Sequence, residues 1–169
     1  MATPAATSTS PVARAVAALR AAAERGDAAA VADLLAPDVL FHSPLSARLR
    51  FTGRDEVAAL HGDIFSVLDG LRTAEPFVRD DEAVFSFRGR VRGLELEAMN
   101  RVRVDDDGRI AECMVYARPL PSLAALFSAL PPRVATRRRG RATGLAVLAL
   151  TRPIALFLRV TDRLAPRVI

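Results

Sequence analysis

The chain has 169 residues, 51% of them hydrophobic and 25% charged, a composition typical of a globular domain. A single cysteine, Cys113, excludes an internal disulfide and a cysteine-based metal cluster, and two histidines are too few for a histidine-rich site, so we predict neither metal nor cofactor. Residues 1–130 hold 15 arginines and 18 acidic residues, a net charge of −3. Residues 131–169 hold nine arginines and one acidic residue, a net charge of +8, so any electrostatic partner belongs to this segment.

Residues 1–10 are rich in small and polar residues and predict a disordered head. They lack the basic and apolar regions of a signal peptide, so we expect a cytoplasmic location. A helical pattern begins at Pro11 and ends at Gly26, and Asp27 then caps a second helix that ends near Pro37. A short β-prone run follows over Val39–Ser43.

A third helix is predicted after this strand. Thr52 and Asp55 have the spacing of a capping box, and Gly70 supplies an end signal. The helix carries an apolar stripe that includes Leu60, with His61 beside it.

The remainder predicts four strands, over residues 73–78, 83–91, 94–104 and 109–118. Arg92-Gly93 and Asp105–Gly108 are the turn signals between the last three. Three helices followed by mainly antiparallel strands predict an α+β fold rather than a βαβ alternation.

Charge and hydropathy agree on the pairing of these strands. A two-residue turn at Arg92-Gly93 brings arginines opposite glutamates on one face and apolar residues together on the other. The predicted pairs are Arg90 with Glu95, Arg88 with Glu97, Phe87 with Ala98, and Phe85 with Asn100. The same parity in the next hairpin places Cys113 and Val115 on the Asn100 face and Glu112 and Tyr116 on the outer face.

Three segments, "RGDAAAVADLLAPDVLFHSP", "FTGRDEV" and "AMNRVRVDDDGRIAECMVYARPL", resemble the nuclear transport factor 2-like superfamily, and in particular its SnoaL-like members from actinomycetes. The resemblance covers roughly residues 12–130. It implies a cone: a curved, mainly antiparallel sheet wrapped by three N-terminal helices, with a pocket in the concavity and a homodimer formed through the outer face. The superfamily includes ketosteroid isomerases, dehydratases, cyclases and members without known catalysis.

The resemblance also implies that the isomerase residues are not retained here. Ser43 stands where the isomerases carry a carboxylate base, and Leu19 where they carry a tyrosine. Asn100 stands where they carry a protonated aspartate, and it keeps the capacity to donate a hydrogen bond. The resemblance therefore supports the pocket and argues against steroid isomerisation by that mechanism.

Asn100 is the leading candidate site residue, since an amide on an otherwise apolar face needs a partner. It either donates to a ligand oxygen or bonds to the backbone as a structural amide. His42 and His61 are alternative catalytic bases, each with packing as its other interpretation. Predicted ligand-binding residues lie on the inner face: Phe41, Ser43, Phe85, Phe87, Ala98, Asn100 and Cys113.

Residues 131–169 predict a basic amphipathic tail after the cone at residues 11–130. Pro131-Pro132 is expected to end the preceding helix, and Arg133–Arg141 forms a basic cluster. Ile154–Leu164 follows as an amphipathic helix. The tail, over 133–164, either lies on an anionic membrane surface or packs against the cone or a second subunit.

The sequence thus predicts a protein that binds a small hydrophobic molecule, either as an isomerase, dehydratase or cyclase or as a binder. The competing hypothesis is a non-catalytic dimerisation module whose tail contacts a membrane or a partner. Nucleic-acid binding by the sheet is disfavoured because the arginines of its outer face, Arg88 and Arg90 among them, have glutamate partners.

Overall fold

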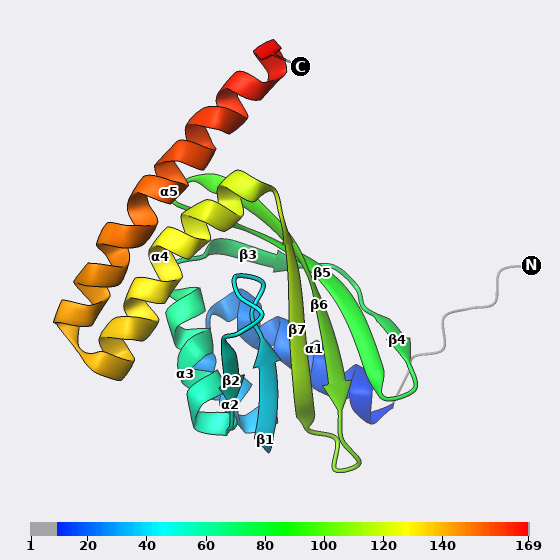
Figure 1. The fold of residues 1–169 in the computed structure, drawn as a ribbon. Helices are drawn as coiled ribbons and strands as arrows, with labels where there is room; N and C mark the ends of the chain where they lie inside the picture. The colour runs from blue at the N-terminus through cyan, green and yellow to red at the C-terminus, as the bar shows by residue number, and fades with distance from the viewer. Residues whose placement is uncertain (1–9, 169) are drawn as a thin grey trace, which may run out of the picture.

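The computed structural model describes residues 10–168 and shows five helices around a curved sheet (Figure 1). The predicted head lies outside the described residues, apart from Ser10. The Ser10 side chain accepts a hydrogen bond from the Ala13 amide at 3.2 Å and so caps helix α1, Pro11–Arg25. Gly26, with φ of 68°, ends α1 as predicted.

Helix α2, Ala28–Leu34, is capped by Asp27, whose Oδ1 accepts from the Ala30 amide at 2.9 Å. Strand β1, Leu35–His42, follows directly, four residues earlier than predicted. Helix α3, Arg54–Phe65, has Gly53 at its N-cap. The predicted Thr52 cap is therefore wrong, because Thr52 ends the short strand β2, Arg50–Thr52, which pairs with β1.

The sheet has seven strands, in the order β2-β1-β7-β6-β5-β3, with β4 also paired to β5. Their bounds are β3 Asp69–Thr73, β4 Phe77–Arg79, β5 Glu82–Val91, β6 Leu94–Val104 and β7 Ile110–Arg118. Only the β1–β7 pair is parallel among these strands. The single strand predicted at 73–78 is replaced by two strands, β3 and β4. The third helix ends at Phe65 rather than at the predicted Gly70, which lies in β3.

The predicted register of the long hairpin is confirmed at each of its four pairs. Arg92 and Gly93 form the turn with φ of 50° and 78°. On the outer face Arg88 pairs with Glu97 at 2.9 Å, and Arg90 with Glu95 at 3.4 Å. Parity in the next hairpin is also confirmed, because Glu112 pairs with Arg103 on the outer face while Cys113 is buried.

Two long helices complete the fold: α4, Leu120–Arg139, and α5, Arg141–Val168. The prediction that Pro131-Pro132 ends the preceding helix is wrong, because α4 continues through both prolines. Proline cannot donate a backbone hydrogen bond, so Pro132 leaves the Ser128 carbonyl without its usual partner. The Arg92 guanidinium replaces it, donating from Nη2 to Ser128 O at 3.2 Å. A turn of the sheet thus satisfies the helix at the point where its own backbone cannot.

Helix α4 packs on the cone, where its apolar residues join the main hydrophobic core. The buried members Leu126, Leu130 and Val134 recur every four residues and form one stripe. Residues 131–139 therefore belong to a helix that covers the sheet, rather than to a segment separate from it (Figure 1).

Candidate functional site

A cavity of about 460 Å³ lies between the concave face of the sheet and helices α1, α3, α4 and α5. This volume falls within the range of small-molecule sites. Its walls are mostly apolar and aromatic. Phe41, Phe85 and Phe87 line it from the sheet, and Leu60 and Leu130 from the helices.

Asn100 lies on β6 and lines this cavity, as predicted. Its neighbours on the adjacent strands are Phe85 on β5 and Val115 on β7. Only 7% of the residue is exposed, and its Oδ1 atom is fully buried without a hydrogen-bond partner in the part of the chain that the structure describes. The side chain thus places a polar amide on a mostly apolar wall of the cavity.

His61 lies on α3 and lines the same cavity. Its Nδ1 lies 2.8 Å from the Val57 carbonyl oxygen one turn earlier. A carbonyl only accepts, so Nδ1 carries the hydrogen and Nε2 keeps its lone pair. The ring packs edge-on against Phe41 at 5.7 Å between centroids and near Phe65 at 5.8 Å. Burial lowers the pKa of His61 despite the Val57 hydrogen bond, so the imidazole is neutral at pH 7.

Other predicted binding residues divide into two groups. Phe41, Ser43, Phe85, Phe87 and Ala98 line the cavity. Ser43 Oγ also accepts from the Leu45 amide at 3.2 Å, at the bend after β1.

Cys113 and His42 do not line the cavity. Cys113 is fully buried beside Phe41 and Val102, and burial raises the pKa of its thiol to about 12. A thiol with this pKa is inert at neutral pH. His42 Nε2 lies 3.2 Å from Glu112 Oε1, on the opposite side of β1. Strict alternation along β1 explains this placement, because Phe41 and Ser43 occupy the inner face.

The side of the cavity formed by α4 and α5 was missed from the sequence. Val134, Arg138, Arg139, Thr143 and Val147 line it there. The four-residue spacing of Leu126, Leu130 and Val134 was the available signal, but the proline pair was interpreted as a boundary.

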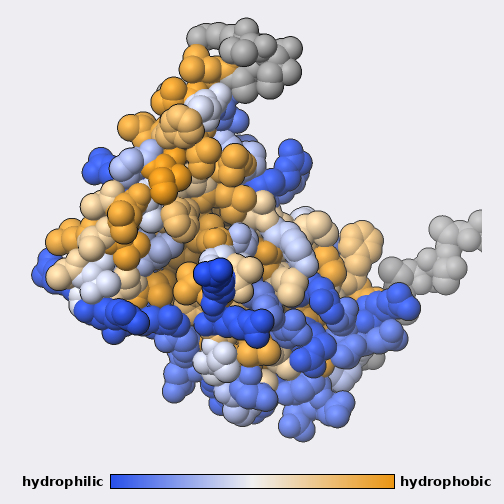
Figure 2. Space-filling view, in the orientation of Figure 1, coloured by the Kyte–Doolittle hydropathy of each residue, from blue (hydrophilic) through white to orange (hydrophobic). Residues whose placement is uncertain are grey.

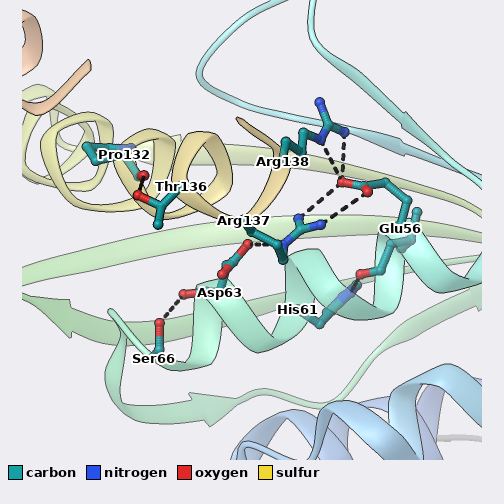
Figure 3. Close-up of polar contacts among 9 residues, drawn as sticks. Glu56, His61, Asp63, Ser66, Pro132, Thr136, Arg137 and Arg138 are labelled. Atoms are coloured by element: carbon teal, nitrogen blue, oxygen red, sulfur yellow. Dashed lines mark hydrogen bonds and ion pairs between the residues drawn. The ribbon is translucent and has the colours of Figure 1, made fainter. Parts of the chain in front are cut away.

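An ion-pair cluster fastens α4 over the cavity (Figure 3). Arg137 reaches from α4 to two residues of α3, with Nη2 at 3.1 Å from Glu56 and Nε at 2.9 Å from Asp63. Arg138 donates to Glu56 at 2.7 Å, and its guanidinium carbon lies 4.7 Å from the centre of the Phe51 ring. Burial alone would raise the pKa of Glu56, but the hydrogen bonds from Arg137 and Arg138 outweigh it and lower that pKa.

The chemistry available in the cavity is limited. His61 is the one lining residue that can exchange a proton near neutral pH, and no aspartate or glutamate lines the walls formed by the described residues. The part of the chain that the structure describes also holds no group of three or more His, Cys, Asp or Glu residues placed to bind a metal ion. What remains is a mostly apolar chamber with one amide, one neutral imidazole, the hydroxyls of Ser43, Thr73 and Thr143, and the arginines Arg138 and Arg139 on the side formed by α4 and α5.

Comparison with known families decides the assignment. The model of the SnoaL-like domain matches residues 16–113, which is more than half of the chain. This chain belongs to the SnoaL-like family. A comparison with curated proteins gave no significant match.

Solved structures of the same nuclear transport factor 2-like fold include several bacterial proteins. A steroid delta-isomerase from Pseudomonas aeruginosa is 26% identical, with a TM-score of 0.69 over 80% of this chain and 98% of that one. A nuclear transport factor 2-like protein of unknown function from Mesorhizobium loti is 27% identical, with a TM-score of 0.57 over 64% and 92%. A ketosteroid isomerase-like protein from Catenulispora acidiphila, in complex with trimethylamine, is 17% identical, with a TM-score of 0.54 over 66% and 89%. The predicted fold is therefore confirmed.

Proposed function

We propose that this SnoaL-like protein binds a small hydrophobic molecule with one polar oxygen, which Asn100 holds by a hydrogen bond. The observation that carries the proposal is the Asn100 side chain, which lines a mostly apolar cavity of about 460 Å³ and has no hydrogen bond to the described residues. A polar amide on an apolar wall needs a partner, and its nitrogen can donate to a ligand oxygen in the cavity. A purely structural module would be expected to fill this interior with side chains.

The polar groups of the cavity define the class of ligand. A ketone or aldehyde oxygen accepts from the Asn100 amide nitrogen, and a hydroxyl donates to His61 Nε2. Most of the remaining walls contact carbon, with Arg138 and Arg139 adding positive charge on the side formed by α4 and α5. A mainly hydrophobic ketone or hydroxyketone therefore fits the cavity.

Displacement of a hydrophobic fluorescent probe tests this binding. The purified chain is titrated with the probe and then with a panel of hydrophobic ketones, steroids among them. Asn100→Leu removes the amide at nearly constant size, and Met99→Leu changes the neighbouring residue on the outer face, where Met99 is 48% exposed. The proposal requires ketones to displace the probe from the wild type and from Met99→Leu with similar affinity. The affinity of the ketones for Asn100→Leu should be at least tenfold lower, which is the effect of losing one hydrogen bond. Equal displacement from all three proteins refutes it.

A second candidate function is catalysis by proton transfer. Its specific support is that His61 is neutral and has a free Nε2 in the same cavity as the Asn100 donor. The neutral imidazole would remove a proton from the carbon next to the ligand carbonyl, and Asn100 would donate to the resulting enolate oxygen. Return of the proton to another carbon completes an isomerisation. The similarity to a steroid delta-isomerase fits this class of reaction, although Ser43 takes the place of a carboxylate base.

Deuterium exchange tests catalysis without knowledge of the product. A ketone that binds is incubated with the protein in deuterated water, and its mass is followed with time. His61→Phe keeps the aromatic contacts and removes the base, while His42→Phe is the matched control outside the cavity. Catalysis predicts exchange that falls by about 10²-fold or more in His61→Phe and Asn100→Leu. Binding without exchange makes the protein a binder.

A further inference from the structure

The outward face of helix α5 is unusually apolar. Large side chains along it are 45–72% exposed: Leu145, Leu150, Ile154, Leu156, Phe157 and Val160. Hydrophobic residues gather along this helix in the space-filling view (Figure 2). The C-terminal half of α5 also projects beyond the sheet (Figure 1).

The opposite face of α5 packs on α4. Gly144 marks the closest approach, since a Cβ there would lie 1.8 Å from Thr136 Oγ1 and 2.9 Å from the Pro132 carbonyl oxygen. Thr143 and Val147 line the cavity from the same helix. The segment Arg141–Asp162 is long and apolar enough to cross a membrane, and 17% of its most apolar stretch is buried. It is therefore not an ordinary core helix, and its apolar face needs a partner outside the chain.

Arginines line one edge of this apolar face. Arg141, Arg152 and Arg159 are spaced by eleven and seven residues, about three and two helical turns, so they share one side of α5. None of the three has an ion-pair partner among the side chains that the structure describes, and Arg141 and Arg152 are exposed, whereas Arg159 is half-buried with its Nε fully buried. Arg137 and Arg138 differ, because Glu56 and Asp63 already neutralise them. Part of the predicted basic cluster thus holds α4 in place, while Arg133 and Arg139 on α4 and Arg141 and Arg152 on α5 are exposed without an ion pair among the described side chains.

The partner of α5 must match both its apolar face and its charge. A second copy offers an apolar face but brings the net charge of +4 on residues 141–168, five arginines and one aspartate, against an equal charge. A nucleic acid matches the charge and leaves the leucines and phenylalanine in water. An anionic bilayer meets both requirements, because acyl chains cover the apolar face and headgroups reach the arginines at its edge.

We propose that α5 lies in the plane of an anionic membrane surface, with its apolar face in the lipid and the exposed Arg141 and Arg152 at the headgroups. Arg152 falls in the middle of the apolar segment, and an in-plane helix keeps it at headgroup level whereas a spanning helix buries it. The inference is independent of the ligand in the cavity, because the outward residues of α5 do not line it.

Flotation of the full chain with vesicles tests this proposal. Vesicles of equimolar phosphatidylglycerol and phosphatidylcholine are compared with pure phosphatidylcholine, at about 0.1 M and 1 M salt, where the Debye length is about 10 Å and 3 Å. We expect flotation with the anionic vesicles that weakens at high salt. The combined change Leu150→Glu and Phe157→Glu should abolish it. Replacing Arg141 and Arg152 by Gln should lower the partition coefficient about 25-fold, since each arginine contributes about fivefold near such a surface.

Matched controls lie on β4, on the other side of the molecule from α5 (Figure 1). Phe77→Glu introduces a charge at a residue that is 83% exposed. Arg79→Gln removes a charge from a side chain that is 93% exposed. Both should leave flotation unchanged. Because all these positions are exposed, unchanged thermal unfolding verifies that the variants fold.

Three results overturn the proposal. Wild type that floats equally with neutral and anionic vesicles removes the role of charge. Flotation that survives Leu150→Glu with Phe157→Glu removes the role of α5. A concentration-dependent dimer that these same changes dissociate, without vesicle binding, makes a second copy the occupant.

Discussion

Asn100→Leu should make the ligand-free protein more stable while it destroys binding. The wild type carries a fully buried Oδ1 without a partner among the described residues, and an unsatisfied buried group costs about 1–3 kcal/mol. Leucine has nearly the same size, lies between Phe85 and Val115 on the inner face, and has no polar atom to satisfy. We therefore expect the free energy of unfolding to rise by about 1–3 kcal/mol.

Thermal unfolding measures this gain. For a chain of this length each kcal/mol shifts Tm by about 2–4 °C, so Asn100→Leu should unfold roughly 2–12 °C above the wild type. Ligand should shift the difference toward the wild type by at least about 1.3 kcal/mol, because at about 100 times the wild-type Kd it adds about 2.7 kcal/mol to the wild type and at most about 1.4 kcal/mol to a variant that binds tenfold more weakly. Met99→Leu, on the exposed face of the same strand, should change neither value.

The refuting result is a ligand-free Asn100→Leu protein that unfolds below the wild type. The amide would then be satisfied within the folded chain or by bound water, and its role would be structural. The shift toward the wild type with ligand is the second check, because a structural amide gives no reason for ligand to favour the wild type.

Two further predictions concern titration and the attachment of α4. The pKa of Cys113 is about 12 in the folded chain against 9.0 for a free thiol, so the thiol of the unfolded chain loses its proton first as pH rises. The free energy of unfolding should therefore fall above pH 9, by roughly 1.4 kcal/mol per pH unit. Urea unfolding at pH 8–11 measures this slope, and Cys113→Ala should abolish it. Glu56→Gln should lower unfolding free energy by about 1–2 kcal/mol at pH 7, since it loses the charge that Arg137 and Arg138 contact, whereas Glu95→Gln on the exposed sheet should cost under about 0.5 kcal/mol. Because the pKa of Glu56 is lowered in the folded chain, its contribution to stability is present above 4.5, the ordinary pKa of a glutamate, and is lost as pH falls below it. Glu56→Gln should lack this acid sensitivity.

The sheet was predictable from the sequence because two independent patterns constrain it. Alternation along β5 and β6 fixes which residues face inward, and the Arg–Glu pairs allow only one register. A shift of one residue would place Asn100 among the arginines of the outer face. The position of Asn100 in the cavity followed from this register alone.

The helical side of the site was less predictable because long-range contacts override local signals there. Pro131-Pro132 would end an isolated helix, but Arg92 donates to the Ser128 carbonyl and Arg137 fastens the following turn to α3. Both contacts join residues more than 35 positions apart, so no local pattern reveals them. His61 shows the same limit, since its neighbours on α3 indicated only that it lies beside an apolar stripe.

Native mass spectrometry of the protein purified from its own host tests the central claim most directly. The account predicts a wild-type chain that retains one small hydrophobic molecule, released on denaturation, and an Asn100→Leu chain that is bare. Met99→Leu, purified in parallel, should retain the same molecule as the wild type. A wild-type chain that carries no molecule under these conditions, or an Asn100→Leu chain that carries it equally, would contradict the claim that Asn100 holds a ligand in this cavity.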